Sequence, residues 1–343
     1  MSSTQAQAIV SSAVSSPLVT SHSPQSVDVS VLVPAKDEAE NLPLFMELAE
    51  STFRATPGVS FEVIVIDDGS EDDSWAVLQQ LTQRYSFLRL ARHRSRRGIA
   101  DALRTGYLLA RGRVLVFYPA DLQFRPDDIP QLVAPILSDE ADMVTGFKEG
   151  KYEKRLVSGV YNKLSRLLFD VKVKDLNSVK AYRREIMDGL PVRPDWHRYM
   201  VVIAAAQGFK VAEVPVPLYP RHAGRSKFAT WHRIPIGVLD MLSVWFELRF
   251  AQKPLLLFGM LGAALFGLGV LAGVVAFVWL VVAHEGIRAV WTVIQTCLIL
   301  GSIFFSTGLL GEQIAGQRAE VRELRRRLDE GGSASSDGNQ MSH

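Results

Sequence analysis

Cysteine is almost missing from this chain of 343 residues, and neither charge sign dominates. The single cysteine, Cys297, excludes a disulfide framework within the chain and a zinc site built from cysteines. Lysine and arginine number 38 against 36 aspartate and glutamate, and a formal charge of +2 argues against a general nucleic-acid-binding protein. The pattern G-x-x-x-x-G-K-[ST] is also absent, which excludes a P-loop nucleotide site.

Residues 1–27 contain no Asp, Glu, Lys or Arg and consist mostly of Ser, Ala, Thr, Gln and Val. They lack both the basic start and the continuous apolar run of a secretory signal peptide. We therefore expect residues 1–27 to be a disordered tail.

From Asp28 to about Lys148, short apolar runs alternate with helical stretches. This alternation is typical of an α/β domain with a mainly parallel sheet covered on both faces. The predicted strands are Val29–Val33, Phe61–Ile66, Phe87–Leu90, Val114–Tyr118 and Met143–Phe147. The predicted helices between them are Asn41–Phe53, Asp72–Tyr85, Ile99–Ala110 and Pro126–Leu137. Ligands of such sheets bind beyond the carboxyl ends of the strands.

The C-terminal part of the chain predicts attachment to a membrane. Leu255–Ala283 and Ala289–Leu310 lack formal charges, and each exceeds the ~20 residues that cross a ~30 Å hydrocarbon core. Their short connector predicts a hairpin of two transmembrane helices. Arginine and lysine flank the outer ends of both runs, so we expect the large domain and both termini in the cytoplasm, at the inner (cytoplasmic) membrane.

The remaining sequence patterns predict how the rest of the chain is divided into segments. We expect an α/β domain over residues 28–230, an amphipathic juxtamembrane helix over 231–253, and the transmembrane pair within 254–311. A charged helix from Glu312 to Asp329, followed by a polar tail, occupies 312–343. Tyr152–Phe169 and Ile234–Phe250 are predicted as amphipathic helices and Val211–Val216 as a short strand.

Three acidic loops follow three of the predicted strands: Pro34-Ala35-Lys36-Asp37-Glu38, Asp67-Asp68-Gly69-Ser70 and Pro119-Ala120-Asp121-Leu122-Gln123. A turn or a helix cap explains any one of them. Three carboxylate-bearing loops at one edge are harder to explain in that way, because like charges repel unless a cation or hydrogen-bond donors compensate. Such an edge suits a hard divalent cation, Mg²⁺ or Mn²⁺.

The loops also carry a resemblance. V-P-A-K-D-E-A-E-N-L, V-I-D-D-G-S, R-R-G-I-A-D-A-L-R-T-G and P-A-D-L-Q, in this order, resemble the GT-A-fold family 2 glycosyltransferases. The likeness is to the polyprenyl-phosphate (dolichol-phosphate mannose synthase-like) branch and runs from about Asp28 to Phe228. It implies inverting transfer of a sugar from a nucleotide-diphosphate donor to a membrane polyprenyl phosphate. Relatives form tetramers, so the resemblance also allows a homo-oligomer.

The resemblance assigns roles to residues of the three loops. Pro34, Lys36 and Glu38 match the first nucleotide-contacting loop of the family. Asp67 and Asp68 match the pair that contacts the nucleoside.

The third loop departs from the family's D-A-D-L-Q, because Pro119 replaces the first aspartate. Asp121 and Gln123 are the matching metal-site residues, with one ligand missing, and Asp121 is also the first catalytic candidate.

Downstream residues complete the expected site. Arg221 and Lys227 match the phosphate-contacting positions of the family's R-x-x-G-x-S-K segment, although a basic flank of the first membrane span explains them too. Lys148 stands where the family commonly has arginine in the donor site. Asp175 matches an aspartate near the acceptor, and a plain loop aspartate is an equal interpretation. His197 is better explained as structural than as catalytic.

Three alternatives stay open. A processive polysaccharide synthase would carry a Q-x-x-R-W motif, which is absent, and more than two membrane spans. A membrane-bound nucleotide-sugar-binding protein without catalysis is suggested by Pro119. A glycosyltransferase with a hydroxyl lipid acceptor would need Asp175 as a base. The sequence leaves the sugar, and UDP against GDP, undecided.

Overall fold

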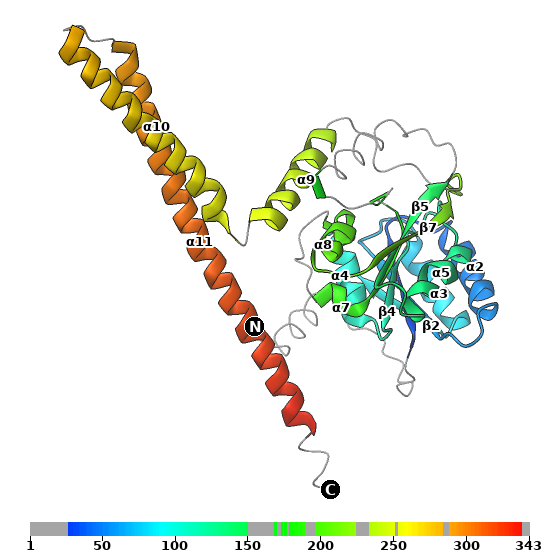
Figure 1. The fold of residues 1–343 in the computed structure, drawn as a ribbon. Coiled ribbons are helices and arrows are strands. Elements are labelled where there is room, and N and C mark those ends of the chain that lie inside the picture. The colour runs from blue at the N-terminus through cyan, green and yellow to red at the C-terminus, as the bar shows by residue number, and fades with distance from the viewer. Residues whose placement is uncertain are drawn as a thin grey trace. The chain divides into compact units, whose positions relative to one another are not determined.

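The computed structural model describes residues 27–149, 168–169, 173, 175–176, 178–188, 196–223, 233–250, 253–283 and 288–337. The chain divides into two compact units, residues 1–238 and 239–343 (Figure 1). The boundary falls within helix α9, Arg233–Phe250.

The first unit is built on a sheet of seven strands among the described residues, in the order β3-β2-β1-β4-β6-β5-β7. Strands β1, β2, β3 and β4 pair in parallel, whereas β6 runs antiparallel to both β4 and β5. The strands are β1 Val29–Ala35, β2 Phe61–Asp67, β3 Leu88–Arg92, β4 Val114–Phe117, β5 Met143–Glu149, β6 Lys180–Arg183 and β7 Val211–Pro217. The predicted mainly parallel α/β sheet is confirmed.

Helices cover both faces of the sheet because the central strands are apolar on both sides (Figure 1). One face packs under α2, α3 and α5, where Val31, Val63 and Val116 are fully buried. The other face packs under α4, whose Gly106 lies so close to Leu32 and Ile66 that a Cβ there would approach Ile66 Cδ1 to 2.9 Å. These helices are α2 Leu42–Arg54, α3 Ser74–Arg84, α4 Ile99–Leu109 and α5 Ile129–Leu137, the last preceded by the 3₁₀ turn Pro126–Asp128.

The sequence pattern missed strand β6 and the short helices that follow it. Strand β6 is only four residues long and both of its ends are basic, so it lacks the apolar run that identified the other strands. The short helices are α7 Arg184–Asp188, the 3₁₀ turn Trp196–Arg198 and α8 Met200–Ala206. Of the predicted helix Tyr152–Phe169, only residues 168 and 169 are described, and both are helical.

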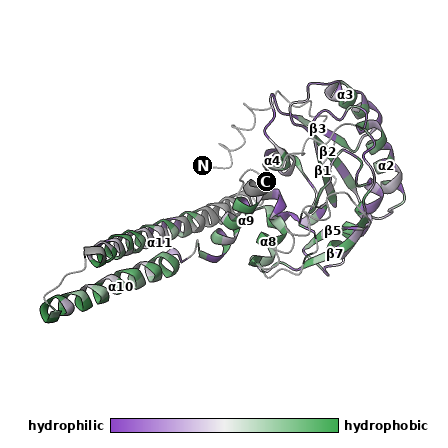
Figure 2. Cartoon of the chain, turned by 90° about the horizontal axis from the view of Figure 1, so that it is seen from above, coloured by the Kyte–Doolittle hydropathy of each residue, from purple (hydrophilic) through white to green (hydrophobic). Residues whose placement is uncertain are grey.

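The second unit contains α10, Pro254–Ala283, and α11, Arg288–Asp337 (Figure 2). Helix α10 and residues Val290–Val321 of α11 are long and apolar enough to span a membrane. They pack against each other along glycines: a Cβ on Gly262 would lie 2.5 Å from Phe305 N, and one on Gly301 would lie 2.6 Å from Phe266 N. Small residues of this kind let two helix backbones approach closely. Helix α11 continues through the predicted charged helix to Asp337 without a break.

Glu62 on β2 connects the amino ends of several strands. Its side chain is 1% exposed and accepts hydrogen bonds from Ser30 Oγ at 2.6 Å, Arg111 N at 2.7 Å and Arg89 Nη1 at 3.1 Å. Burial raises the pKa of this carboxyl, but the hydrogen bonds from Ser30, Arg111 and Arg89 outweigh burial and lower the pKa below its ordinary 4.5.

We expect Glu62→Gln to lower the free energy of unfolding by about 2–3 kcal/mol at pH 7, because an amide leaves the buried donors poorly matched. A lowered carboxyl pKa stabilises the fold above the unfolded value and loses that effect as pH falls. The difference between the two proteins should therefore shrink below pH 4.5. Denaturation of the full chain in detergent, followed by tryptophan fluorescence, measures this. Glu50→Gln, which breaks the partly exposed pair with Arg54, should cost less than about 0.5 kcal/mol.

Candidate active site at the carboxyl edge of the sheet

The three acidic loops meet at one edge because β1, β2 and β4 are adjacent and parallel. Pro34 lies beside Ile66 in the β1–β2 register, and Leu32 lies beside Phe117 in the β1–β4 register. The chain therefore leaves all three strands in the same direction and at nearly the same height. The edge predicted from the sequence to contain the site is the edge on which these loops lie.

The first and second loops are connected by hydrogen bonds. Lys36 Nζ donates to Gly69 O at 2.8 Å, and Asp37 N donates to Ser70 Oγ at 2.9 Å. Asp37 has a φ of 50° and accepts a bond from Glu71 N at 2.9 Å. A left-handed backbone at a residue other than glycine costs energy, and here the bonds between the loops offset that cost. Lys36 is thereby fixed at the carboxyl edge.

Glu38 and Asp67 also hold local structure. Glu38 Oε2 accepts a bond from Asn41 Nδ2 at 2.6 Å, just before helix α2. Asp67 is fully buried, accepts from Ser70 N at 2.9 Å and lies 3.0 Å from Arg92 Nε. The carboxylate of Asp67 thus fixes the turn of the second loop.

Asp68 fixes the entrance to helix α4. Its two carboxylate oxygens accept from the backbone N–H groups of Arg97 and Gly98, each at 2.8 Å, and Oδ1 lies 2.8 Å from His93 Nδ1. Burial raises the pKa of Asp68, but the bonds from His93, Arg97 and Gly98 lower it further than burial raises it. His93, which the sequence pattern did not single out, also contacts Thr105 Oγ1 at 2.9 Å and ties the loop to α4.

The third loop meets a residue from far along the chain. Arg221 Nη2 lies 3.0 Å from Asp121 Oδ2 and 3.3 Å from Gln123 Oε1. Gln123 N donates to Asp121 Oδ1 at 3.2 Å, a turn made possible by Leu122 at a φ of 56°. The two predicted metal-site residues and one predicted phosphate-contacting residue therefore share one cluster.

Arg221 reaches this cluster because the segment after β7 is attached to the third loop. Tyr219 N donates to Gln123 O at 2.9 Å, and the guanidinium of Arg125 stacks 4.2 Å from the Tyr219 ring centroid. Arg221 lies two residues beyond this attachment. Lys227, the other predicted phosphate-contacting residue, lies outside the described residues.

A second group of charged residues lies at the ends of β5 and β6. Lys148 Nζ is 3.2 Å from Asp175 Oδ2, so the predicted donor-site and acceptor-site residues form an ion pair. Beside them Lys180 is fully buried and donates to Ser178 O at 2.8 Å. Burial lowers the pKa of Lys180 to about 7. Sequence reasoning missed Lys180, because it is the first residue of β6, a strand that the sequence pattern did not identify.

His197 packs against the same strand end. Its ring lies edge-on to Phe117 at 6.2 Å between centroids and is 7% exposed. Burial lowers its pKa to about 3, and the positive charges of Lys180 and Arg198 lower it in the same direction. A histidine held neutral in this way does not act as a proton donor at neutral pH.

The oxygen atoms of Asp121 and Gln123 suit Mg²⁺ or Mn²⁺. These ions take one or two protein oxygens and complete their coordination with water and substrate phosphates. Within the described part of the chain, no three His, Cys, Asp or Glu side chains are grouped as a metal site, and Pro119 adds no donor. The side chains present fit a cation that a diphosphate helps to bind.

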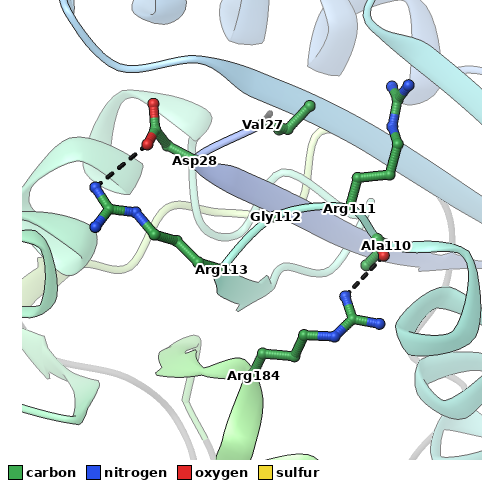
Figure 3. Close-up of a pocket in the computed structure, with 7 residues that line it drawn as sticks. All are labelled: Val27, Asp28, Ala110, Arg111, Gly112, Arg113 and Arg184. Atoms are coloured by element: carbon green, nitrogen blue, oxygen red, sulfur yellow. Dashed lines mark hydrogen bonds and ion pairs between the residues drawn. The ribbon is translucent and has the colours of Figure 1, made fainter. Parts of the chain in front are cut away.

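The carboxyl edge is distinct from a pocket of about 640 Å³ at the opposite end of the strands (Figure 3). That pocket lies where β1 and β4 begin, and its arginines have partners within the protein. Arg113 pairs with Asp28 at 3.2 Å, and Arg184 donates to Ala110 O at 2.7 Å. These contacts explain the arginines as supports for the strand ends rather than as a binding site.

Comparison with known proteins identifies the first unit. Residues 30–185, which contain all three acidic loops, match the family model for glycosyl transferase family 2. This segment is a glycosyl transferase family 2 domain. The glucosyl-3-phosphoglycerate synthase of Mycobacterium tuberculosis, solved with Mn²⁺ and UDP-glucose, shares its fold with a TM-score of 0.51 and 21% identity over 65% of this chain and 84% of that chain. The GT-A fold is thereby confirmed.

Three relatives of this glycosyltransferase have functions that their names state. A dodecaprenyl-phosphate galacturonate synthase of Rhizobium johnstonii is 28% identical over 85% of this chain and 88% of its own. A dolichol-phosphate mannosyltransferase of Pyrococcus furiosus is 30% identical over 58% of each chain. An undecaprenyl-phosphate 4-deoxy-4-formamido-L-arabinose transferase of Shewanella sediminis is 26% identical over 87% of this chain and 90% of its own. The expected family and enzyme class are confirmed.

We expect Lys180→Met to raise the melting temperature at pH 7 by about 4 °C, because it removes a charge that burial disfavours. With its pKa lowered from 10.5 to about 7, Lys180 binds fewer protons in the folded protein than in the unfolded chain between those pH values. Native stability should therefore rise with pH in that window, and the advantage of the variant should shrink by pH 9. Thermal unfolding at both pH values measures this, with the exposed Lys210→Met as a control. An advantage that grows with pH would contradict the prediction.

Proposed function

We propose that this glycosyltransferase transfers a sugar from a nucleotide-diphosphate sugar to a polyprenyl phosphate in the membrane, with inversion at the anomeric carbon. The observation that carries the proposal is the cluster of Asp121, Gln123 and Arg221 at the carboxyl edge, which offers oxygens for a cation and a guanidinium for a diphosphate. The acceptor is inferred from the relatives, two of which match this chain over 85% and 87% of its length.

The donor nucleotide is proposed to lie over the first and second loops. Pro34, Lys36 and Glu38 belong to the first loop, and Lys36 is fixed there by its bond to Gly69 O. Asp67 and Asp68 support the proposal through the shape of the loop that they hold. We also assign Lys148 to the donor site, where its side chain is paired with the carboxylate of Asp175.

Charge neutralisation is the main chemical task when the donor loses its nucleoside diphosphate. Mg²⁺ or Mn²⁺ bound by Asp121 and Gln123 would act as a Lewis acid for the leaving diphosphate. Arg221 adds a planar pair of N–H donors that suits phosphate oxygens, and we assign Lys227 the same role as a point charge. The related fold of glucosyl-3-phosphoglycerate synthase was solved with Mn²⁺ and UDP-glucose, which supports a divalent cation here.

The acceptor phosphate needs little help to become a nucleophile. A phosphate monoester with a second pKa near ~6 is largely dianionic at neutral pH. Asp175 is therefore proposed to orient the acceptor rather than to remove a proton, and its ion pair with Lys148 at 3.2 Å holds the carboxylate in place. A single in-line attack on the donor sugar would invert its anomeric carbon.

The second unit is proposed to bring this chemistry to the bilayer. Helices α10 and α11 would span the inner membrane as a hairpin, with the glycosyltransferase domain and both termini in the cytoplasm. Leu239 and Leu242 of α9 are 62% and 48% exposed, which suits contact with the membrane surface. The lipid chain of the acceptor could then stay in the bilayer. A homo-oligomer, such as the tetramer expected from the resemblance, stays a prediction.

The proposal predicts that full-length protein in detergent transfers labelled sugar to undecaprenyl or dolichyl phosphate, read as label extracted into organic solvent. A panel of UDP- and GDP-sugars with Mg²⁺ or Mn²⁺ would identify the donor. Asp121→Asn should lower the rate at least about 100-fold, since it removes the charge that binds the cation. Asp139→Asn, an exposed carboxylate beside Arg183 at the opposite edge, is the matched control and should retain full activity. Nucleotide-sugar binding without any product would favour a non-catalytic protein instead.

Asp175→Asn separates a phosphate acceptor from a hydroxyl acceptor such as diacylglycerol. With a phosphate acceptor, we expect kcat to fall less than about tenfold, because no general base is required. With a hydroxyl acceptor, loss of a base should cost about 10²–10⁴-fold. The assay uses both acceptors at saturating donor, and thermal unfolding checks that the variant is folded.

A further inference from the structure

The guanidinium of Arg221 occupies the oxygens that suit a divalent cation. Its Nη2 atom contacts Asp121 Oδ2 at 3.0 Å and Gln123 Oε1 at 3.3 Å. The Asp121 side chain is 13% exposed and that of Arg221 is 24% exposed, so water screens this pair only in part. The other carboxylate oxygen, Asp121 Oδ1, accepts from Gln123 N at 3.2 Å.

A cation cannot bind both side-chain oxygens while Arg221 holds them. A guanidinium and a dication on the same two oxygens would overlap and repel each other. Binding of Mg²⁺ or Mn²⁺ to Asp121 Oδ2 and Gln123 Oε1 therefore requires Arg221 to leave.

Pro119 makes this competition stronger. With an aspartate at position 119, two carboxylates would face one guanidinium and leave a net negative charge for a cation. In this chain Asp121 is the only acidic residue of the loop Pro119–Gln123, and its carboxylate faces the guanidinium of Arg221 at 3.0 Å. The attraction for a dication is correspondingly lower.

The attachment of Arg221 allows its side chain to move while its backbone stays near the loop. Tyr219 N is bonded to Gln123 O at 2.9 Å, and the Tyr219 ring is stacked by Arg125. Arg221 therefore stays within reach of the cluster. A diphosphate offers several anionic oxygens in the planar geometry that a guanidinium binds best.

We propose that Arg221 makes cation binding conditional on the nucleotide: its guanidinium blocks Asp121 and Gln123 until a nucleoside diphosphate draws it away. This inference rests on the proposed function for its nucleotide-diphosphate donor. Arg221 is then a positioning residue for the cation as well as a phosphate contact. Cation and nucleotide bind with positive coupling, part of which belongs to Arg221.

The test measures Mn²⁺ binding by electron paramagnetic resonance on the full-length protein in detergent. Without nucleotide, Arg221→Gln should bind Mn²⁺ about 5- to 150-fold more tightly than wild type, the range of typical coupling energies. Arg221→Lys keeps the positive charge but loses the planar guanidinium. Its Mn²⁺ affinity should lie between those of wild type and Arg221→Gln. Arg113→Gln, which removes an equal charge at the opposite edge, should match wild type. Asp121→Asn combined with Arg221→Gln should abolish the gain.

Saturating UDP or GDP provides the second half of the test. Either nucleotide should tighten Mn²⁺ binding more in wild type than in Arg221→Gln, because the variant has no block to release. If Arg221 only contacts phosphate, wild type and Arg221→Gln should have equal Mn²⁺ affinities without nucleotide. Equal or weaker Mn²⁺ binding by Arg221→Gln would therefore overturn the proposal. Lipid product is measured on the same preparations, so tighter Mn²⁺ binding without product would refute the acceptor and leave the role of Arg221 intact.

Discussion

The parallel pairing of β1, β2 and β4 brings acidic side chains to one edge of the sheet, and the rest of the site depends on compensating their charge. The carboxylates of the second and third loops have positive groups or backbone donors from other segments as partners. Asp68 is held by His93 and two backbone N–H groups, and Asp121 by Arg221. These partners compensate the repulsion between the carboxylates, and the same contacts fix the loops relative to one another.

These contacts divide the acidic residues into two kinds. The carboxylates of Asp67 and Asp68 bind groups of the surrounding loops and strands, so these two residues hold the second loop in its shape. Asp121 and Gln123 share the side chain of Arg221 as a partner, and on our proposal this side chain gives up their oxygens to a metal cation. Burial differs in the same direction: the side chain of Asp67 is fully buried, whereas that of Asp121 is 13% exposed. A glycosyltransferase needs both kinds, because a fixed binding surface must still admit and release a charged leaving group.

The two units suit different solvents. The first buries apolar strands between helices, whereas α10 and the part of α11 up to Leu324 expose many large apolar side chains. The two helices contact each other through glycines. An exposed apolar surface of this extent is stable in a bilayer and not in water. The exposed apolar surface of the helix pair supports the membrane acceptor of the proposed function.

Local chemistry in the sequence determined the apolar strands, the acidic loops, the family and the two long apolar helices, since each is set by neighbouring residues. Strand β6 was missed, because four residues with basic ends gain their structure only from pairing with β4 and β5. Only the tertiary structure brought Arg221 onto Gln123, 98 residues earlier, and Lys180 into a buried position beside Phe117. Such contacts depend on strand order and on the segment after β7, and no local pattern records the distance between residues so far apart in the chain.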